Sequence, residues 1–144
     1  MRLMVAFDGS EGARAALREA ASLARETGAP VVLAQVLQPL IDAAKVMAPT
    51  TAEAMKTVEA QTRAALEAVA KEFELDAAAT EIVVESARRG EDDAEALERI
   101  AAEQSATMIV ISSRRAASVV GTLLGSVTSH VIRHAPCPVL VVRE

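Results

Sequence analysis

The chain has 144 residues, a formal net charge of −5 and two aromatic residues, Phe7 and Phe73. An acidic protein with almost no rings for base stacking lacks the general surface that binds nucleic acid. The length suits one domain over residues 1–144, and a single cysteine, Cys137, excludes an internal disulfide. The first apolar run is too short for a signal peptide, and no run approaches the ~20 residues of a membrane span, so we expect a soluble, cytoplasmic protein.

Apolar runs typical of buried strands alternate along the chain with helical repeats. The first strand, over 2–7, ends at Asp8-Gly9-Ser10, where Ser10 is expected to cap a helix that runs to Thr27 and stops at Gly28. After it we expect a strand over 31–37, a loop over 38–49 and a helix with a Thr50–Glu53 capping box. Three further strands are expected over 81–86, 107–111 and 139–142, and two further helices over 92–103 and 126–134.

Strands that alternate with helices predict parallel pairing through right-handed crossovers. The expected fold class is α/β: a five-stranded parallel sheet in the order 3-2-1-4-5, with helices on both faces in a Rossmann-like or flavodoxin-like arrangement. The ligand crevice of such a sheet opens between the carboxyl ends of strands 1 and 4. Asp8 and the segment 112–126 fall there, and the helix start at Gly125-Ser126 would present backbone N–H groups to a phosphate.

Three stretches carry a resemblance to a known family: Val5 to Ser10, the turn at Gly90 with the helix after it, and the tail from Gly125 to Val142. On these stretches the chain resembles a universal stress protein over nearly its whole length. The resemblance implies an adenine nucleotide alpha hydrolase-like variant of the fold. Nucleotide-binding members carry the signature G-x2-G-x9-G-(S/T), and this chain keeps the spacing but has Ser112, Arg115 and Gly125-Ser126 at its positions.

By this resemblance the ligand is ATP or a related adenine nucleotide, with or without Mg²⁺. Asp8 would approach the ribose or a metal-bridged phosphate, Val36 would meet adenine through its backbone, and Ser126 would contact phosphate. The full set of expected binding residues is Asp8, Val36, Ser112, Arg114, Arg115, Gly125, Ser126 and Val127.

Ser112 and Arg115 replace glycines that let a backbone wrap around phosphate. Ser112 fits if its φ is negative, and its hydroxyl is a hydrogen-bond donor. Arg115 adds bulk where close approach is wanted, although Arg114 and Arg115 also supply guanidinium groups suited to phosphate. The sequence therefore predicts a modified, weakened site. Arg88 and Arg89 are expected either on the same rim or as solvated partners of Glu91, Asp92 and Asp93.

Several candidates also have a purely structural explanation. Asp8 suits a turn beside a helix N-terminus, Val36 suits strand core, and Gly125-Ser126 suits a flexible helix start with an N-cap. Two classes of function therefore stay open: a nucleotide-responsive regulatory module, and a dimeric interaction scaffold that has lost nucleotide binding. No catalytic triad or nucleophile elbow can be recognised, so we expect at most slow ATP hydrolysis, as in some relatives.

His130 and His134 lie four residues apart on one helix face with Cys137 just beyond, a spacing that is compatible with a zinc site. No glutamate follows His130 to act as a base, and the sequence shows no clear fourth ligand. His134 near a helix C-terminus already has a favourable place for positive charge. We therefore expect no metal site.

The last apolar strand, Val139 to Val142, is expected at the edge of the sheet, with too little chain after it to cover that edge. An exposed apolar edge favours pairing with another chain. Because family members commonly pair such strands across a two-fold axis, we expect a homodimer through this strand. The protein client of such a module is not identified by the sequence.

Overall fold

The computed structural model describes residues 1–39, 52–113 and 124–143. Its five-stranded parallel sheet has the order β3-β2-β1-β4-β5, so the predicted α/β topology is confirmed. No helix in these ranges is long and apolar enough to cross a bilayer. The elements in chain order are β1 (Leu3–Ala6), α1 (Glu11–Thr27), β2 (Val31–Leu37), α3 (Ala52–Glu72), the 3-10 turn η1 (Ala77–Ala79), β3 (Thr80–Ser86), α4 (Asp93–Glu103), β4 (Met108–Ser113), α5 (Ser126–His134) and β5 (Val139–Arg143).

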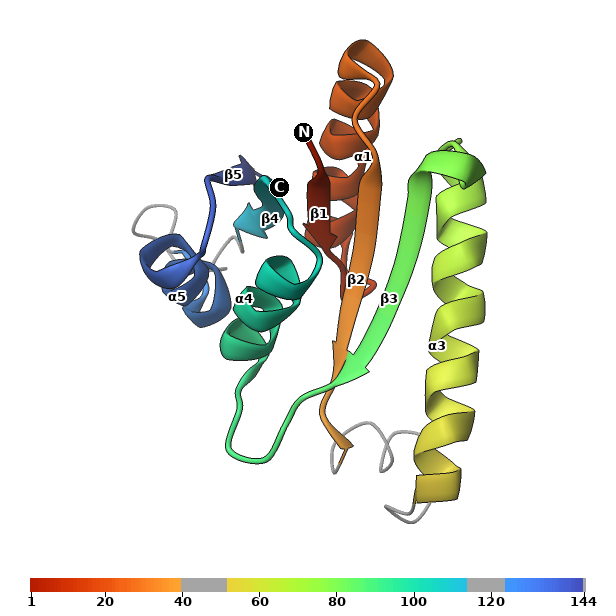
Figure 1. Cartoon of the computed structure of the whole chain (residues 1–144), viewed down its shortest axis with the longest axis vertical. Helices are drawn as coiled ribbons and strands as arrows, with labels where there is room; N and C mark the ends of the chain where they lie inside the picture. The colour runs from red at the N-terminus through yellow and green to blue at the C-terminus, as the bar shows by residue number, and fades with distance from the viewer. Residues whose placement is uncertain (40–51, 114–123, 144) are drawn as a thin grey trace.

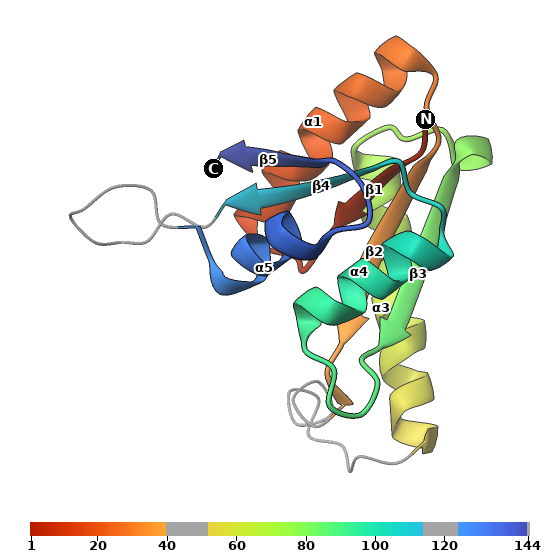
Figure 2. The same ribbon diagram turned by 60° about the vertical axis from the view of Figure 1, so that its left-hand side comes forward.

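Helices cover both faces of the sheet (Figures 1 and 2). Because successive strand residues point to opposite faces, two separate cores form. α1 and α3 pack on one face against residues such as Val5, Leu33 and Val84. α4 and α5 pack on the other face against residues such as Met4, Val32 and Ile109. The central strands are therefore buried on both sides.

The first helix begins and ends where the sequence predicts. The Ser10 side chain accepts a hydrogen bond from the Ala13 N–H at 3.1 Å, as an N-cap residue does. At the other end Gly28 adopts φ 74°, a left-handed conformation that suits glycine, and its N–H donates to the Ala24 carbonyl. These caps fix the path of the chain from β1 to β2.

The fourth strand is longer than predicted. β4 continues through Ser112 and Ser113, which pair in register with Val142 and Arg143 of β5, so the expectation that the loop starts at Ser112 is wrong. Hydrogen-bonded pairing with β5 keeps these two serines in an extended conformation, although they lack the apolar pattern of a buried strand.

Smaller differences concern element ends. The 3-10 turn η1 was not predicted, and Asp92 is the N-cap of α4 rather than its first residue. β1 is shorter than predicted by one residue at each end, while β3 and β5 each gain one residue. The predicted capping box cannot be assessed, because Thr50 lies outside the described residues.

Candidate functional site

A cavity of about 200 Å³ opens where β1 and β4 lie side by side and the chain leaves them toward opposite faces. This is the topological switch point at which open α/β sheets bind ligands. Complete small-molecule sites usually measure roughly 300–1,000 Å³, so the described residues enclose room for part of a nucleotide-sized ligand. Residues from the predicted binding set that line the cavity are Asp8, Val36, Ser112, Gly125, Ser126 and Val127. Arg114 and Arg115 lie outside the described residues.

The start of α5 faces this cavity without a capping side chain. Its N-cap is Gly125, with φ −62° and ψ 161°, and no side chain of the described residues caps the first turn by a hydrogen bond. The other two long helices that begin near the cavity are capped, α1 by Ser10 and α4 by Asp92. Because the first N–H groups of a helix have no acceptor within the helix, those of α5 are oriented to bind an anion.

Ser126 is the first residue of α5 rather than its cap. The explanation of Ser126 as a structural N-cap is therefore wrong. It lies on the cavity wall at the first turn of α5.

Asp8 borders the same cavity at the end of β1. Its Oδ1 accepts a hydrogen bond from the Ser10 N–H at 3.0 Å, which closes the turn between β1 and α1. The structural explanation for Asp8, a turn beside the N-terminus of a helix, is thus correct. Asp8 is also exposed at the cavity.

Ser112 replaces the first signature glycine without backbone strain. Among the described non-glycine residues, only Glu74 and Ser105 have positive φ, so Ser112 has an ordinary strand conformation that any residue adopts. Its carbonyl oxygen accepts a hydrogen bond from Thr128 Oγ1 at 2.8 Å. Thr128 is 4% exposed, and this contact fixes the start of α5 against the end of β4.

The family model described as universal stress protein family matches residues 1–143. The chain belongs to this family. No curated protein sequence gives a significant match.

Solved structures of universal stress proteins share the fold. UspA from Lactobacillus plantarum has a TM-score of 0.74 at 22% identity, covering 99% of this chain and 97% of that chain. A complex of the Archaeoglobus fulgidus protein with dAMP has a TM-score of 0.66 at 25% identity, with coverage of 99% and 97%. A universal stress protein in complex with cAMP has a TM-score of 0.67 at 21% identity, with coverage of 99% and 96%.

Within this stress-protein fold, a hydrogen bond links two elements beside the cavity. Gln38 Nε2, just after β2, donates to Asp93 Oδ1 at the start of α4 at 2.7 Å. Asp93 lines the cavity together with Asp8, and no lysine or arginine does so among the described residues. The described part of the site is therefore electronegative apart from the helix N-terminus.

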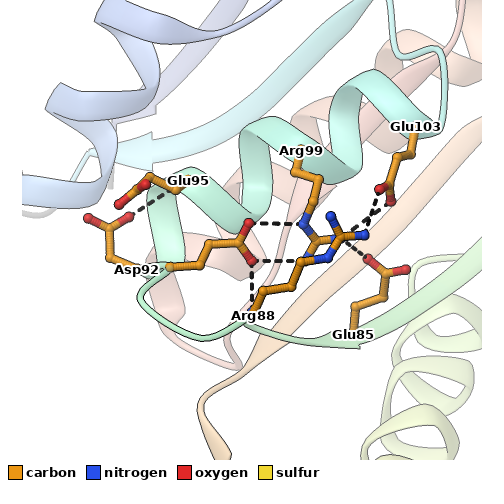
Figure 3. Close-up of polar contacts among 7 residues, drawn as sticks. Glu85, Arg88, Asp92, Glu95, Arg99 and Glu103 are labelled. Carbon is orange, nitrogen blue, oxygen red and sulfur yellow. Dashed lines mark hydrogen bonds and ion pairs between the residues drawn. The ribbon is translucent and has the colours of Figure 1, made fainter.

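Arg99 on α4 organises the turn that leads into this helix (Figure 3). Its Nε and Nη2 donate to the two carboxylate oxygens of Glu91 at 2.9 and 3.0 Å, and its Nη1 lies 2.9 Å from Glu85 Oε2 on β3. The bidentate Arg99 contact holds the pKa of Glu91 at about 2, below its ordinary 4.5. Since Asp93 follows this turn directly, the cluster also fixes one wall of the cavity.

Arg88 belongs to the same cluster and not to the cavity. Its backbone N–H donates to Glu91 Oε1 at 3.0 Å, and its Nη2 lies 3.2 Å from Glu103 Oε1 at the end of α4. Neither Arg88 nor Arg89 lines the cavity. Of the two alternatives for this pair, the cavity rim is therefore wrong, and the alternative of acidic partners is correct for Arg88 through Glu91.

Sequence reasoning missed Gln38, Asp93, Thr128 and Arg99. Ala94 and Leu97, three residues apart on α4, are buried, so this spacing marks the buried face of the helix. No local pattern indicated that Thr128 would reach the carbonyl of a residue 16 positions earlier in the chain. A buried hydroxyl needs a hydrogen-bond partner, so the presence of a threonine on the inner face of α5 is the only sequence feature that could have indicated this contact.

Proposed function

We propose that this universal stress protein is a regulatory module that binds an adenine nucleotide in the cavity at the carboxyl edge of its sheet, more weakly than members with all three signature glycines. The observation that carries the proposal is the uncapped first turn of α5 at the cavity, where Gly125 brings no side chain to compete with a phosphate. Ser112 lies in β4 without backbone strain, so the expected weakening is assigned to Arg115.

The charges around the cavity favour a nucleotide that arrives with Mg²⁺. Asp8 and Asp93 would repel a bare triphosphate, whereas carboxylate oxygens are ligands that Mg²⁺ accepts alongside phosphate oxygens. Asp8 is the residue proposed to approach the ion or the ribose. Arg114 and Arg115 are proposed as the cationic partners of the phosphates.

The relatives support adenine as the base. Proteins of the same family and fold have been solved with dAMP and with cAMP. In this chain Val36 and Val127 bring partly buried apolar surface to the cavity, which suits a flat nucleobase. We propose that adenine lies beside Val36 and that the phosphates point toward Gly125 and Ser126.

The test is ligand-induced thermal stabilisation with ATP, dAMP and cAMP, each with and without Mg²⁺, together with native mass spectrometry of the purified protein. The parent should be stabilised, and Ser126→Ala should bind less tightly by about 0.5–3 kcal/mol, the range for losing a neutral or charged hydrogen bond. Absence of any shift at millimolar ATP would contradict the nucleotide module and favour the interaction scaffold.

We further propose that the protein forms a homodimer through β5. This strand is at the edge of the sheet, and the Leu140 side chain is 38% exposed there, whereas β1 is almost fully buried. An unpaired apolar edge strand is suited to antiparallel pairing with a second copy.

Sedimentation measures the dimer directly. The parent should sediment as a dimer at tens of micromolar, and Leu140→Lys should weaken the association by placing like charges across the two-fold axis. Ala60→Lys adds the same charge on the exposed surface of α3 and should leave the mass unchanged. A monomeric parent would contradict the proposal.

A further inference from the structure

Glu98 on α4 and the only two histidines of the chain, His130 and His134 on α5, meet between the two helices. Each residue offers one potential ligand atom, and these atoms all lie within 4.8 Å of one another. The sequence alone shows no clear further ligand beside the two histidines and therefore predicts no metal here. The structure supplies Glu98, which lies 32 positions before His130 in the chain and reaches the site through the packing of α4 against α5.

We propose that Glu98, His130 and His134 form a binding site for Zn²⁺ that links α4 to α5. This inference does not depend on nucleotide binding. Two imidazoles and one carboxylate form a three-ligand set that zinc takes in proteins, with water in the fourth position. Mg²⁺ and Ca²⁺ prefer all-oxygen sites and are disfavoured by the two nitrogen ligands.

The hydrogen bond of His134 leaves its other ring nitrogen to the metal. His134 Nδ1 lies 3.1 Å from the carbonyl oxygen of His130. A carbonyl only accepts, so Nδ1 carries the hydrogen, and the neutral ring then has its lone pair on Nε2. Donation from the second nitrogen to a backbone carbonyl is the usual arrangement behind a metal-bound histidine.

Glu98 and His130 are already at near-ligand distance. Glu98 Oε1 lies 2.8 Å from His130 Nδ1, so a hydrogen bond joins the two side chains. Tetrahedral zinc with ligands at roughly 2.0–2.1 Å holds neighbouring ligand atoms about 3.3–3.4 Å apart. Zn²⁺ would therefore replace the hydrogen between the two atoms after the pair opens slightly, in keeping with the proton release that accompanies metal binding.

Zinc binding would also require a movement of the His134 side chain. Its ring centroid lies 4.3 Å from that of His130, with the ring planes tilted by 33°. His134 is exposed, whereas the side chain of Glu98 is only 16% exposed, so His134 can turn toward the other two without disturbing the core. The site thus combines a largely buried carboxylate, a histidine hydrogen-bonded to that carboxylate and an exposed histidine hydrogen-bonded to the backbone.

Calorimetric titration of ZnCl2 into untagged, chelator-treated protein tests the proposal without nucleotide present. We expect one Zn²⁺ per chain and a rise in melting temperature with ZnCl2 that MgCl2 does not reproduce. His134→Ala and Glu98→Gln should each weaken zinc binding by at least roughly tenfold. Because His134 is exposed, His134→Ala should keep the melting temperature of the metal-free parent.

Cys137→Ser is the matched control, because Cys137 is the other residue of the chain with a strong preference for zinc. This variant should bind Zn²⁺ as the parent does. The proposal is overturned if the parent shows no binding at millimolar ZnCl2, if His134→Ala and Glu98→Gln both bind like the parent, or if binding is lost only in Cys137→Ser.

Discussion

Thr128 Oγ1 donates a hydrogen bond to the carbonyl oxygen of Ser112 at 2.8 Å, and this contact joins the end of β4 to the first turn of α5. The two segments carry the first and last positions of the nucleotide signature. Their relative placement therefore depends on a buried threonine that the signature does not include.

Thr128→Val should destabilise the protein by about 0.5–1.5 kcal/mol, because the hydrogen bond from the buried Thr128 hydroxyl to the Ser112 carbonyl is lost while the shape of the side chain is kept. Urea unfolding measures the change. Thr128→Ser retains the hydroxyl and should recover much of the loss. If Thr128→Val matches the parent in stability, the hydrogen bond does not hold α5 in place.

Gly125→Asp should leave stability unchanged or raise it by a few tenths of a kcal/mol, since Gly125 has the backbone conformation of an N-cap that aspartate can occupy. Nucleotide binding should be lost, because the new carboxylate takes the N–H groups and repels phosphate. Thermal shifts with and without ATP report both effects. Gly125→Asn adds a cap without a charge and should weaken binding less, whereas equal binding by all three proteins would place the phosphate elsewhere.

Asp8→Asn should respond to ATP differently with and without Mg²⁺. If the carboxylate meets a metal-bridged phosphate, binding with Mg²⁺ weakens and binding without it improves, because a repulsive charge is removed. Asparagine keeps an oxygen that can accept the Ser10 N–H, so the turn should survive. Titration calorimetry in the two conditions decides the matter, and an identical effect in both would rule out the metal contact.

Arg115→Gly should bind ATP more tightly than the parent, because it restores the second signature glycine and removes a side chain from a position of close approach. Arg114→Gly is the neighbouring control, and it should weaken binding by removing a cationic partner only. Titration calorimetry of the two variants separates the effect of side-chain bulk on ATP affinity from the effect of side-chain charge. Weaker binding by Arg115→Gly would show that its guanidinium is a phosphate ligand.

The Arg99–Glu91 contact predicts a specific acid sensitivity. A carboxyl group whose pKa falls on folding stabilises the fold above its ordinary pKa, and the contribution is lost as pH falls through the folded value. For Glu91 the loss should run from about pH 4.5 to about pH 2. Glu91→Gln should therefore cost about 1.5–3 kcal/mol at neutral pH, with a difference from the parent that shrinks across this range.

Glu67→Gln is the matched control for acid unfolding, since Glu67 is exposed on α3. Its stability should differ little from that of the parent at each pH. If the gap between Glu91→Gln and the parent stays constant from pH 7 to pH 2, the ion pair is not the cause.

Local sequence patterns determined the order of the strands and helices and the location of the cavity. Helical and strand periodicities depend on neighbours a few residues apart, as do the Ser10 cap and the Gly28 stop, so they can be recognised without the fold. Parallel strands joined by helices then place the ends of β1 and β4 together. This reasoning placed Asp8 and Gly125 at one cavity, and the family resemblance added Val36.

The contacts that give this cavity its walls were decided by tertiary structure. Ser112 and Ser113 extend β4 only because β5 pairs with them, and Thr128 reaches Ser112 only because α5 packs over β4. Arg99 and Glu85 come from a helix and a strand, and Glu98 and His130 from two helices. Polar side chains of this kind do not repeat at the spacing of a helix or strand, so the sequence does not show their partners. The packing of the elements decides which buried or half-buried groups come within hydrogen-bond distance of one another.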